Sequence, residues 1–181
     1  MNKAKSNNLR KLIYIAIFTA LVVVVQFIPI RFGPFELALS VPIIVIGAAL
    51  LGPAAGTWLG FVFGAVVLAL PGTAASLSFS LVGTLLTVLL KGTLAGLVAA
   101  LIYRLLKNGN PYVACLVSAV AATLVNTGVF IAGSLIFFET GIAELFTLIL
   151  LTNVVVELAV NIVLVPSVYR IVEIGAKKFK A

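Results

Sequence analysis

The stretch that decides the fold reads LVGTLLTVLLKGTLAGLVAALIYRLL and runs from Leu81 to Leu106. A helix needs about 20 apolar residues to cross a bilayer, so this stretch is long enough to span a membrane. Lys91 lies near its middle. Because an ionisable side chain inside hydrocarbon is costly, such a residue by default marks a functional site with a partner. The stretch therefore predicts a membrane protein and points to its site.

The composition of the whole chain supports this prediction. Of its 181 residues, 63% are hydrophobic and 9% are charged, whereas globular chains are about half apolar and about a quarter charged. The chain has no His, no Asp and one Cys, Cys115. This set of residues disfavours a zinc site and excludes a Ser-His-Asp hydrolase. The net charge of +7 gathers at the chain ends and one short turn, which fits membrane flanks better than a nucleic-acid surface.

The apolar runs predict an all-α membrane protein with six spanning helices in a single domain over residues 1–181. The expected spans are residues 12–29, 35–51, 57–70, 79–106, 112–138 and 143–172. Pro42 lies inside the second span and should kink it. Residues 52–56 are expected to form the next turn, and residues 71–78 to belong to a loop.

Six spans place both chain ends on one side of the membrane. The basic residues before the first span, those at residues 104–107 and those at or beyond the end of the sixth span then fall on that side. Because an excess of Lys and Arg marks the cytoplasmic side, both termini are expected to lie in the cytoplasm, at a bacterial plasma membrane. Pro29-Ile30-Arg31 lacks a small-residue cleavage site, so the first run is expected to be a span rather than a signal peptide.

Four polar side chains share one expected depth in the membrane. At about 1.5 Å per residue, Lys91 and Asn126 lie roughly 18 Å below the outer ends of their spans. Asn153 and Glu157 lie roughly 15 and 21 Å below the outer start of the sixth span, and Asn161 shares their helix face. Two interpretations stay open. Lys91 and Glu157 form an ion pair that orders the bundle, or Lys91 offers its charge to an anionic ligand.

Other polar side chains lie nearer the expected outer face, among them Gln26, Arg31 and Ser80. Each taken alone is expected to be an ordinary residue of the membrane–water interface. Together they are candidates for a polar mouth above the deeper cluster. Arg31 is the one cation expected on that side, and it could attract an anionic solute or pair with Glu36.

Small residues recur at four-residue spacing in three of the expected spans. Such stripes allow two helices to approach closely. For the glycines we expect packing inside the bundle, and for the alanines either packing or contact with another subunit. The stripes are Gly56, Gly60 and Gly64 in the third span, Gly92 and Gly96 in the fourth, and Ala16 and Ala20 in the first.

Several stretches resemble the substrate-binding S components of energy-coupling factor (ECF) vitamin transporters. They are AIFTA at residues 16–20, VPIIVIG at 41–47, LGPAAG at 51–56, Lys91-Gly92 and Tyr103-Arg104. The resemblance covers nearly the whole chain. It implies that Ala16 and Ala20 dock on a transmembrane coupling subunit, and that two partner ATPases hydrolyse ATP. It also implies a vitamin pocket near the outer face, closed by the loops at residues 30–35 and 71–78.

Within that family, the chain most resembles the pantothenate-specific members, through residues 35–64 and NTGVF at 126–130. Folate and riboflavin members are close alternatives. For pantothenate, Lys91 would bind the carboxylate, and Asn126 and Asn153 the amide or hydroxyls. Glu157 would hold Lys91 or accept from a ligand hydroxyl. No cofactor or metal is expected. An autonomous carrier of a small organic anion and a ligand-free structural subunit remain as alternatives, and an enzyme is disfavoured.

Overall fold

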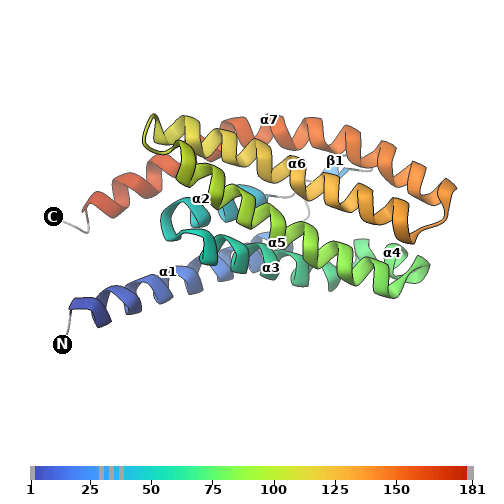
Figure 1. Ribbon diagram of the computed structural model, residues 1–181, viewed down its shortest axis with the longest axis horizontal. Coiled ribbons are helices and arrows are strands. Elements are labelled where there is room, and N and C mark those ends of the chain that lie inside the picture. Colours follow the sequence, from blue (N-terminus) through green and yellow to red (C-terminus); the bar gives the residue numbers. More distant parts are fainter. Residues whose placement is uncertain (1–2, 29–30, 33–34, 37–38, 179–181) are drawn as a thin grey trace.

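The computed structural model describes residues 3–28, 31–32, 35–36 and 39–178, and over these residues the chain is a bundle of helices (Figure 1). The elements are α1 (Lys3–Gln26), α2 (Ser40–Leu51), α3 (Pro53–Leu68), the 3₁₀ turn η1 (Pro71–Thr73), α4 (Ala74–Phe79), α5 (Leu81–Leu106), α6 (Pro111–Phe137) and α7 (Thr140–Lys178). Two short strands, β1 (Arg31–Phe32) and β2 (Phe35–Glu36), pair antiparallel. Apart from this hairpin, the all-α prediction is confirmed for the described residues.

Within the described residues, four helices are long and apolar enough to cross a membrane: α1, α5, α6 and α7. α3 and the segment from η1 to α4 meet the same criterion together, with a bend of 75° between them. α2 has 12 residues, which makes it about 18 Å long, shorter than the hydrocarbon core of about 30 Å. By length and composition, the described residues therefore provide four or five spans, and α2 is too short to cross alone.

The second apolar run begins later than the sequence predicts. Phe35 and Glu36 form β2, and α2 begins only at Ser40. Pro42 therefore lies in the first turn of α2. Because backbone N–H groups of a first turn have no acceptor within the helix, Pro42 removes no hydrogen bond there. The prediction of a kink at Pro42 is wrong for this reason.

The connections around α3 are tighter than predicted, because proline starts helices at both places. One residue, Gly52, joins α2 to α3 with a φ of 91°, a conformation that glycine adopts without a side-chain clash. α3 then starts directly at Pro53, whose fixed φ suits a first helical position. Pro71 likewise begins η1, which leads into α4. The turn expected at residues 52–56 and the loop expected at 71–78 are therefore largely helical.

The backbones of α3 and α5 touch along the two glycine stripes. A Cβ atom built on Gly56 would lie 2.6 Å from the Gly96 carbonyl oxygen, and one on Gly60 would overlap the Gly92 carbonyl. A Cβ atom on Gly64 would lie 2.6 Å from the Val88 carbonyl oxygen. The prediction that these glycines pack inside the bundle is therefore confirmed. Their contacts fix the rotation of α5. They thereby set the direction of the Lys91 side chain, which immediately precedes Gly92.

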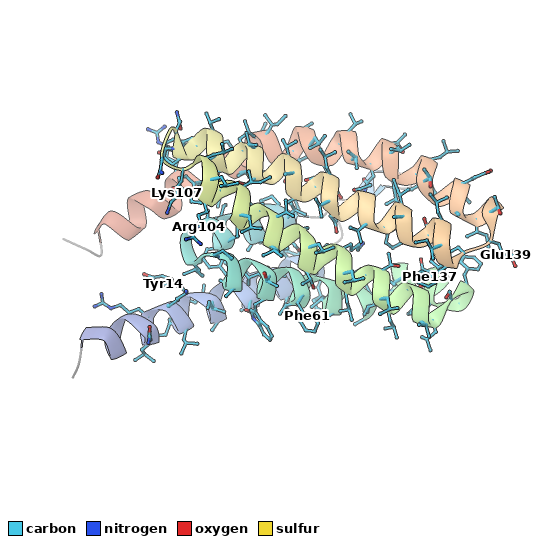
Figure 2. All side chains as sticks on the ribbon, in the orientation of Figure 1. Tyr14, Phe61, Arg104, Lys107, Phe137 and Glu139 are labelled. Carbon is cyan, nitrogen blue, oxygen red and sulfur yellow. The ribbon has the colours of Figure 1, made fainter. Side chains whose placement is uncertain are left out.

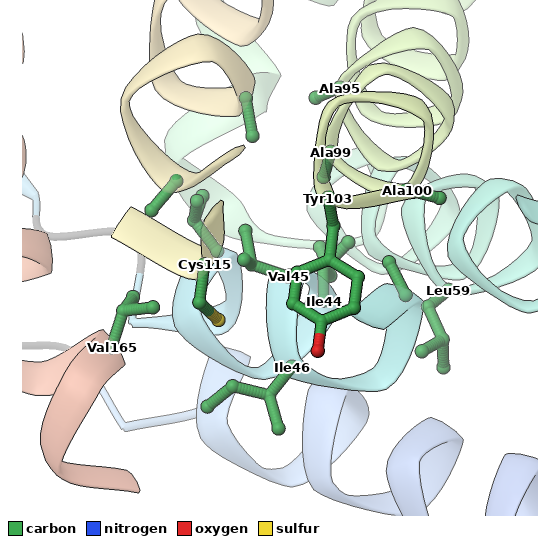
Figure 3. Packing of buried hydrophobic residues seen from close by; sticks show 14 of the residues in the cluster. Ile44, Val45, Ile46, Leu59, Ala95, Ala99, Ala100, Tyr103, Cys115 and Val165 are labelled. Atoms are coloured by element: carbon green, nitrogen blue, oxygen red, sulfur yellow. The ribbon is translucent and has the colours of Figure 1, made fainter. Parts of the chain in front are cut away.

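α2 lies inside the bundle, where other helices surround it. Most of its residues are buried, which agrees with a helix that is apolar nearly all round. Its side chains belong to a core shared with α1, α3, α5, α6 and α7. Figure 3 shows this packing for Ile44, Val45, Ile46, Leu59, Ala95, Ala99, Ala100, Tyr103, Cys115 and Val165.

The two ends of the bundle differ in charge. The start of α1, the end of α7 and the turn between α5 and α6 lie at the same end (Figure 1). Arg104 and Lys107 lie at this end, while Glu139 lies at the opposite one (Figure 2). Alternating helix directions therefore gather basic residues at one end of the molecule, as the positions of these residues in the sequence predict. We call it the basic end.

Candidate functional site

Lys91 lies on α5 between aromatic rings from two other helices. Its Nζ atom is 4.6 Å from the ring centroid of Phe130 on α6 and 6.0 Å from that of Phe63 on α3. An ammonium group within about 6 Å of an aromatic face is attracted by the ring quadrupole. The side chain is partly buried, and Glu157 on α7 is close enough to attract it electrostatically. Four helices thus meet around one cation.

Asn126 lies one helical turn from Phe130, on the same face of α6. Its side chain is 7% exposed, and its Oδ1 atom has no hydrogen-bond partner among the described residues. A buried amide oxygen without a donor costs about 1–3 kcal/mol. Because Phe130 packs on Lys91, the structure brings this open acceptor and the lysine to the same region, as their shared depth predicts.

The polar side chains of α7 follow one face of that helix, as predicted. Asn153 Nδ2 donates to Glu157 Oε1 at 3.4 Å. One turn further, Asn161 Nδ2 donates to the Thr123 hydroxyl of α6 at 2.8 Å. Glu157 and Asn161 are both buried. Glu157 therefore connects the α7 row to Lys91, while Asn161 ties α7 to α6.

Two of the residues predicted for the outer mouth have partners within the chain. Gln26 Oε1 accepts a hydrogen bond from the Ser40 hydroxyl at 2.7 Å, which joins α1 to α2. The Ser80 hydroxyl accepts from the Gly83 N–H at 3.2 Å and caps α5. The hairpin pairs Arg31 with Glu36 along the backbone, while the prediction for the Arg31 side chain lies outside what the structure describes.

The family model described as the substrate-specific component of ECF transporters matches residues 10–172. The chain belongs to this family. The match includes all four polar residues at the predicted common depth. No curated protein and no solved structure gives a match. The family match identifies the chain as a substrate-specific subunit. The match and the apolar helices together indicate that this S component is a multi-pass membrane protein.

The small residues of α1 in this S component face outward. Ala16 and Ala20 are exposed, and Ile17 between them is 50% exposed. Another face of α1 joins α3, where the Trp58 Nε1–H donates to the Thr19 hydroxyl at 3.1 Å. Of the two alternatives for the alanines, packing within the chain is therefore disfavoured, and the surface is open to lipid or to another subunit.

Sequence reasoning did not assign a role to the two rings beside Lys91 in the S component. Phe130 carries one detectable signal, because it lies four residues after Asn126 and so shares its face. Phe63 carries none, since its approach depends on how the glycines of α3 and α5 set the two helices against each other. Among the described residues, no group of three or more His, Cys, Asp or Glu side chains is placed to hold a metal ion.

Proposed function

We propose that this S component binds a small anionic vitamin from the outer side of the membrane, with pantothenate as the first candidate. The observation that carries the proposal is the pairing of a cation and an open acceptor. Lys91 offers its ammonium group beside Phe130, and Asn126 offers a buried amide oxygen without a donor. A ligand with a carboxylate at one end and a hydroxyl or amide N–H nearby would satisfy both groups.

The chemistry of pantothenate fits this arrangement. Its carboxylate would accept from the Lys91 ammonium, a charge-assisted hydrogen bond of the stronger kind. Its amide N–H or a hydroxyl would donate to Asn126 Oδ1. Asn153 and Glu157, joined by a hydrogen bond, would contact the remaining hydroxyls. Glu157 would hold the lysine in place before the ligand arrives. Folate and riboflavin remain the alternative vitamins, since an aromatic ring could also stack on a phenylalanine.

Transport would depend on partner proteins. Members of this family work with a membrane coupling subunit and ATPases, and the chain has no P-loop of its own. The exposed Ala16 and Ala20 surface of α1 is our candidate for the contact with the coupling subunit. Six passes with both ends in the cytoplasm of a bacterium agree with the basic end, which holds the start of α1 and the end of α7.

The deciding experiment is a titration of the purified full chain with pantothenate. Removing one partner of a buried charge pair costs about 2–5 kcal/mol, so Lys91→Ala is expected to weaken binding at least about 30-fold. Arg104→Ala is the matched control, because Arg104 is an exposed cation at the basic end. The neutral alcohol analogue of pantothenate has no carboxylate, so it should bind the Lys91→Ala and Arg104→Ala variants equally weakly. Undiminished pantothenate binding by Lys91→Ala would refute the role of Lys91.

The same material separates the alternatives. Binding of riboflavin or folate, with no binding of pantothenate, would change the vitamin and keep the function. Uptake into liposomes that contain this chain alone would identify an autonomous carrier. Absence of thermal stabilisation by any of these ligands would favour a structural subunit, because a specific ligand stabilises the folded state by mass action.

A further inference from the structure

A groove of about 580 Å³ lies between α6 and α7, and its lining residues are Tyr112, Pro166, Ser167 and Arg170. Tyr112 is in the first turn of α6, after the turn between α5 and α6 that lies at the basic end. Pro166 lies inside α7 and has no N–H to offer the preceding turn, which weakens the helix backbone there. Because α7 ends at the basic end, the groove lies on the basic-end side of Glu157.

One wall of the groove is held in place by aromatic contacts. The ring of Tyr112 meets that of Tyr169 edge to face, with centroids 5.5 Å apart. The Tyr169 hydroxyl in turn forms a hydrogen bond of 2.7 Å with the Tyr103 hydroxyl of α5, inside the core. Three helices therefore fix the position of Tyr112. A fixed wall lowers the entropy cost of binding.

The described part of the groove carries positive charge. Arg170 is exposed, and none of the four lining residues that the structure describes is acidic. Arg104 and Lys107 are exposed at the same end of the bundle (Figure 2) but do not line the groove. The planar guanidinium of arginine matches a phosphate geometrically, since it can donate two parallel hydrogen bonds.

An apolar surface continues from the groove toward the middle of the bundle. Val163 lies one turn before Ser167 on the same face of α7, and the Ser167 hydroxyl donates to its carbonyl at 2.8 Å. Val163 is 66% exposed, and its neighbour Ile162 is 50% exposed. A ligand with a phosphate at one end and a hydrocarbon chain at the other would match both parts of this surface.

We propose that the groove binds the phosphate headgroup of an anionic phospholipid, with Arg170 as its cation and Val163 beneath an acyl chain. Basic pockets between membrane helices on the cytoplasmic side are sites for anionic headgroups. Tyrosines are enriched at the membrane–water interface. This site is separate from the vitamin site. It would place an anionic lipid against α7 whatever ligand Lys91 binds.

Native mass spectrometry of the full chain in detergent, titrated with phosphatidylglycerol, tests this site. One Arg near an anionic surface contributes about 1 kcal/mol, so Arg170→Gln is expected to weaken retention of one lipid about fivefold. Arg170→Lys keeps the charge and should retain most of the binding. Arg104→Gln removes an exposed cation at the same end but outside the groove, and it should bind as the unaltered protein does. Phosphatidylcholine should show no difference among the four proteins.

Two further arms distinguish other occupants. Glycerol 3-phosphate at millimolar concentration should not displace the lipid, and displacement would mean that the groove binds a soluble phosphate instead. Ser167→Leu should fill the groove and also reduce lipid retention. Equal retention by Arg170→Gln and the unaltered protein would overturn the proposal. So would loss of coupling-subunit binding in Arg170→Gln with unchanged lipid retention, because the groove would then be a protein contact.

Discussion

Substitution of Gly64 by Ala is expected to push α3 away from α5 and to destabilise the protein. A Cβ atom at this position would lie 2.6 Å from the Val88 carbonyl oxygen and 3.1 Å from the Leu89 Cα atom. Ordinary contact begins near 3.4 Å, so the two helices would have to separate by 0.8 Å at this point. The obstacle is backbone, which cannot rotate away as a side chain would.

Two opposing terms set the magnitude of this change. Overpacking of a tight contact costs about 1–3 kcal/mol, and the rigid neighbour favours the upper end of that range. Alanine also has a higher helix propensity than glycine, by about 1 kcal/mol. The net loss in the free energy of unfolding for Gly64→Ala is therefore about 2 kcal/mol.

Gly128→Ala is the matched control for this prediction. Gly128 lies inside α6, and a Cβ atom there would meet nothing within 4 Å. Because the gain in helix propensity is common to both variants, the difference between them measures the overlap alone, about 3 kcal/mol. For a chain of this size, that corresponds to a difference of roughly 6–12 °C in the midpoint of thermal unfolding.

The assay is thermal unfolding of the purified variants in one detergent, followed by the loss of helical circular dichroism. Gly64→Ala should also weaken ligand binding, since Val88 lies one turn before Lys91 on α5. The reasoning would be refuted if Gly64→Ala unfolded at the same temperature as Gly128→Ala. That result would mean that α3 and α5 do not pack through their glycines.

Three further variants test the surroundings of the site. Phe130→Leu removes the ring 4.6 Å from Lys91 Nζ and should weaken anion binding about 2–30-fold, the equivalent of about 0.5–2 kcal/mol, whereas Phe63→Leu at 6.0 Å should have less effect in the same titration. If the two variants bound equally well, the ring of Phe130 would have no special role. Asn161→Leu leaves the buried Thr123 hydroxyl without its donor and should lower the free energy of unfolding by about 1–3 kcal/mol, measured by thermal unfolding. A stability equal to that of the unaltered chain would show that this hydrogen bond contributes nothing.

Much of the bundle could be predicted from the sequence, because hydropathy and helix length report directly on membrane helices. The long helices α5 and α6 begin and end within two residues of the predicted spans. The errors gather at prolines. The sequence predicts Pro53 in a turn and Pro71 in a loop, yet both occupy the start of a helix. A proline fixes only its own φ angle, so its identity alone does not distinguish the end of a helix from the beginning of one.

The sequence predicts the depth of the candidate site along the helices, but not the rotation of those helices about their axes. Counting residues at a fixed rise placed Lys91, Asn126 and Glu157 at one level, and the structure brings Lys91 near Glu157 and near the helix face of Asn126. The direction in which Lys91 points depends on contacts between α3 and α5 that no single helix encodes. For that reason Phe63 and Phe130 emerged only from the structure.

The hydrogen bond between Trp58 and Thr19 has a practical consequence. Trp58 is the only tryptophan of the chain, and it lies at the junction of α1 and α3 with its ring stacked near Phe61. Indole emission shifts in wavelength when its N–H gains or loses a partner. The natural fluorescence of the protein is therefore a built-in optical reporter of whether α1 stays seated on α3. A subunit that docks on α1 and displaces it from α3 would shift the emission wavelength of Trp58, so its binding could be followed without any added label.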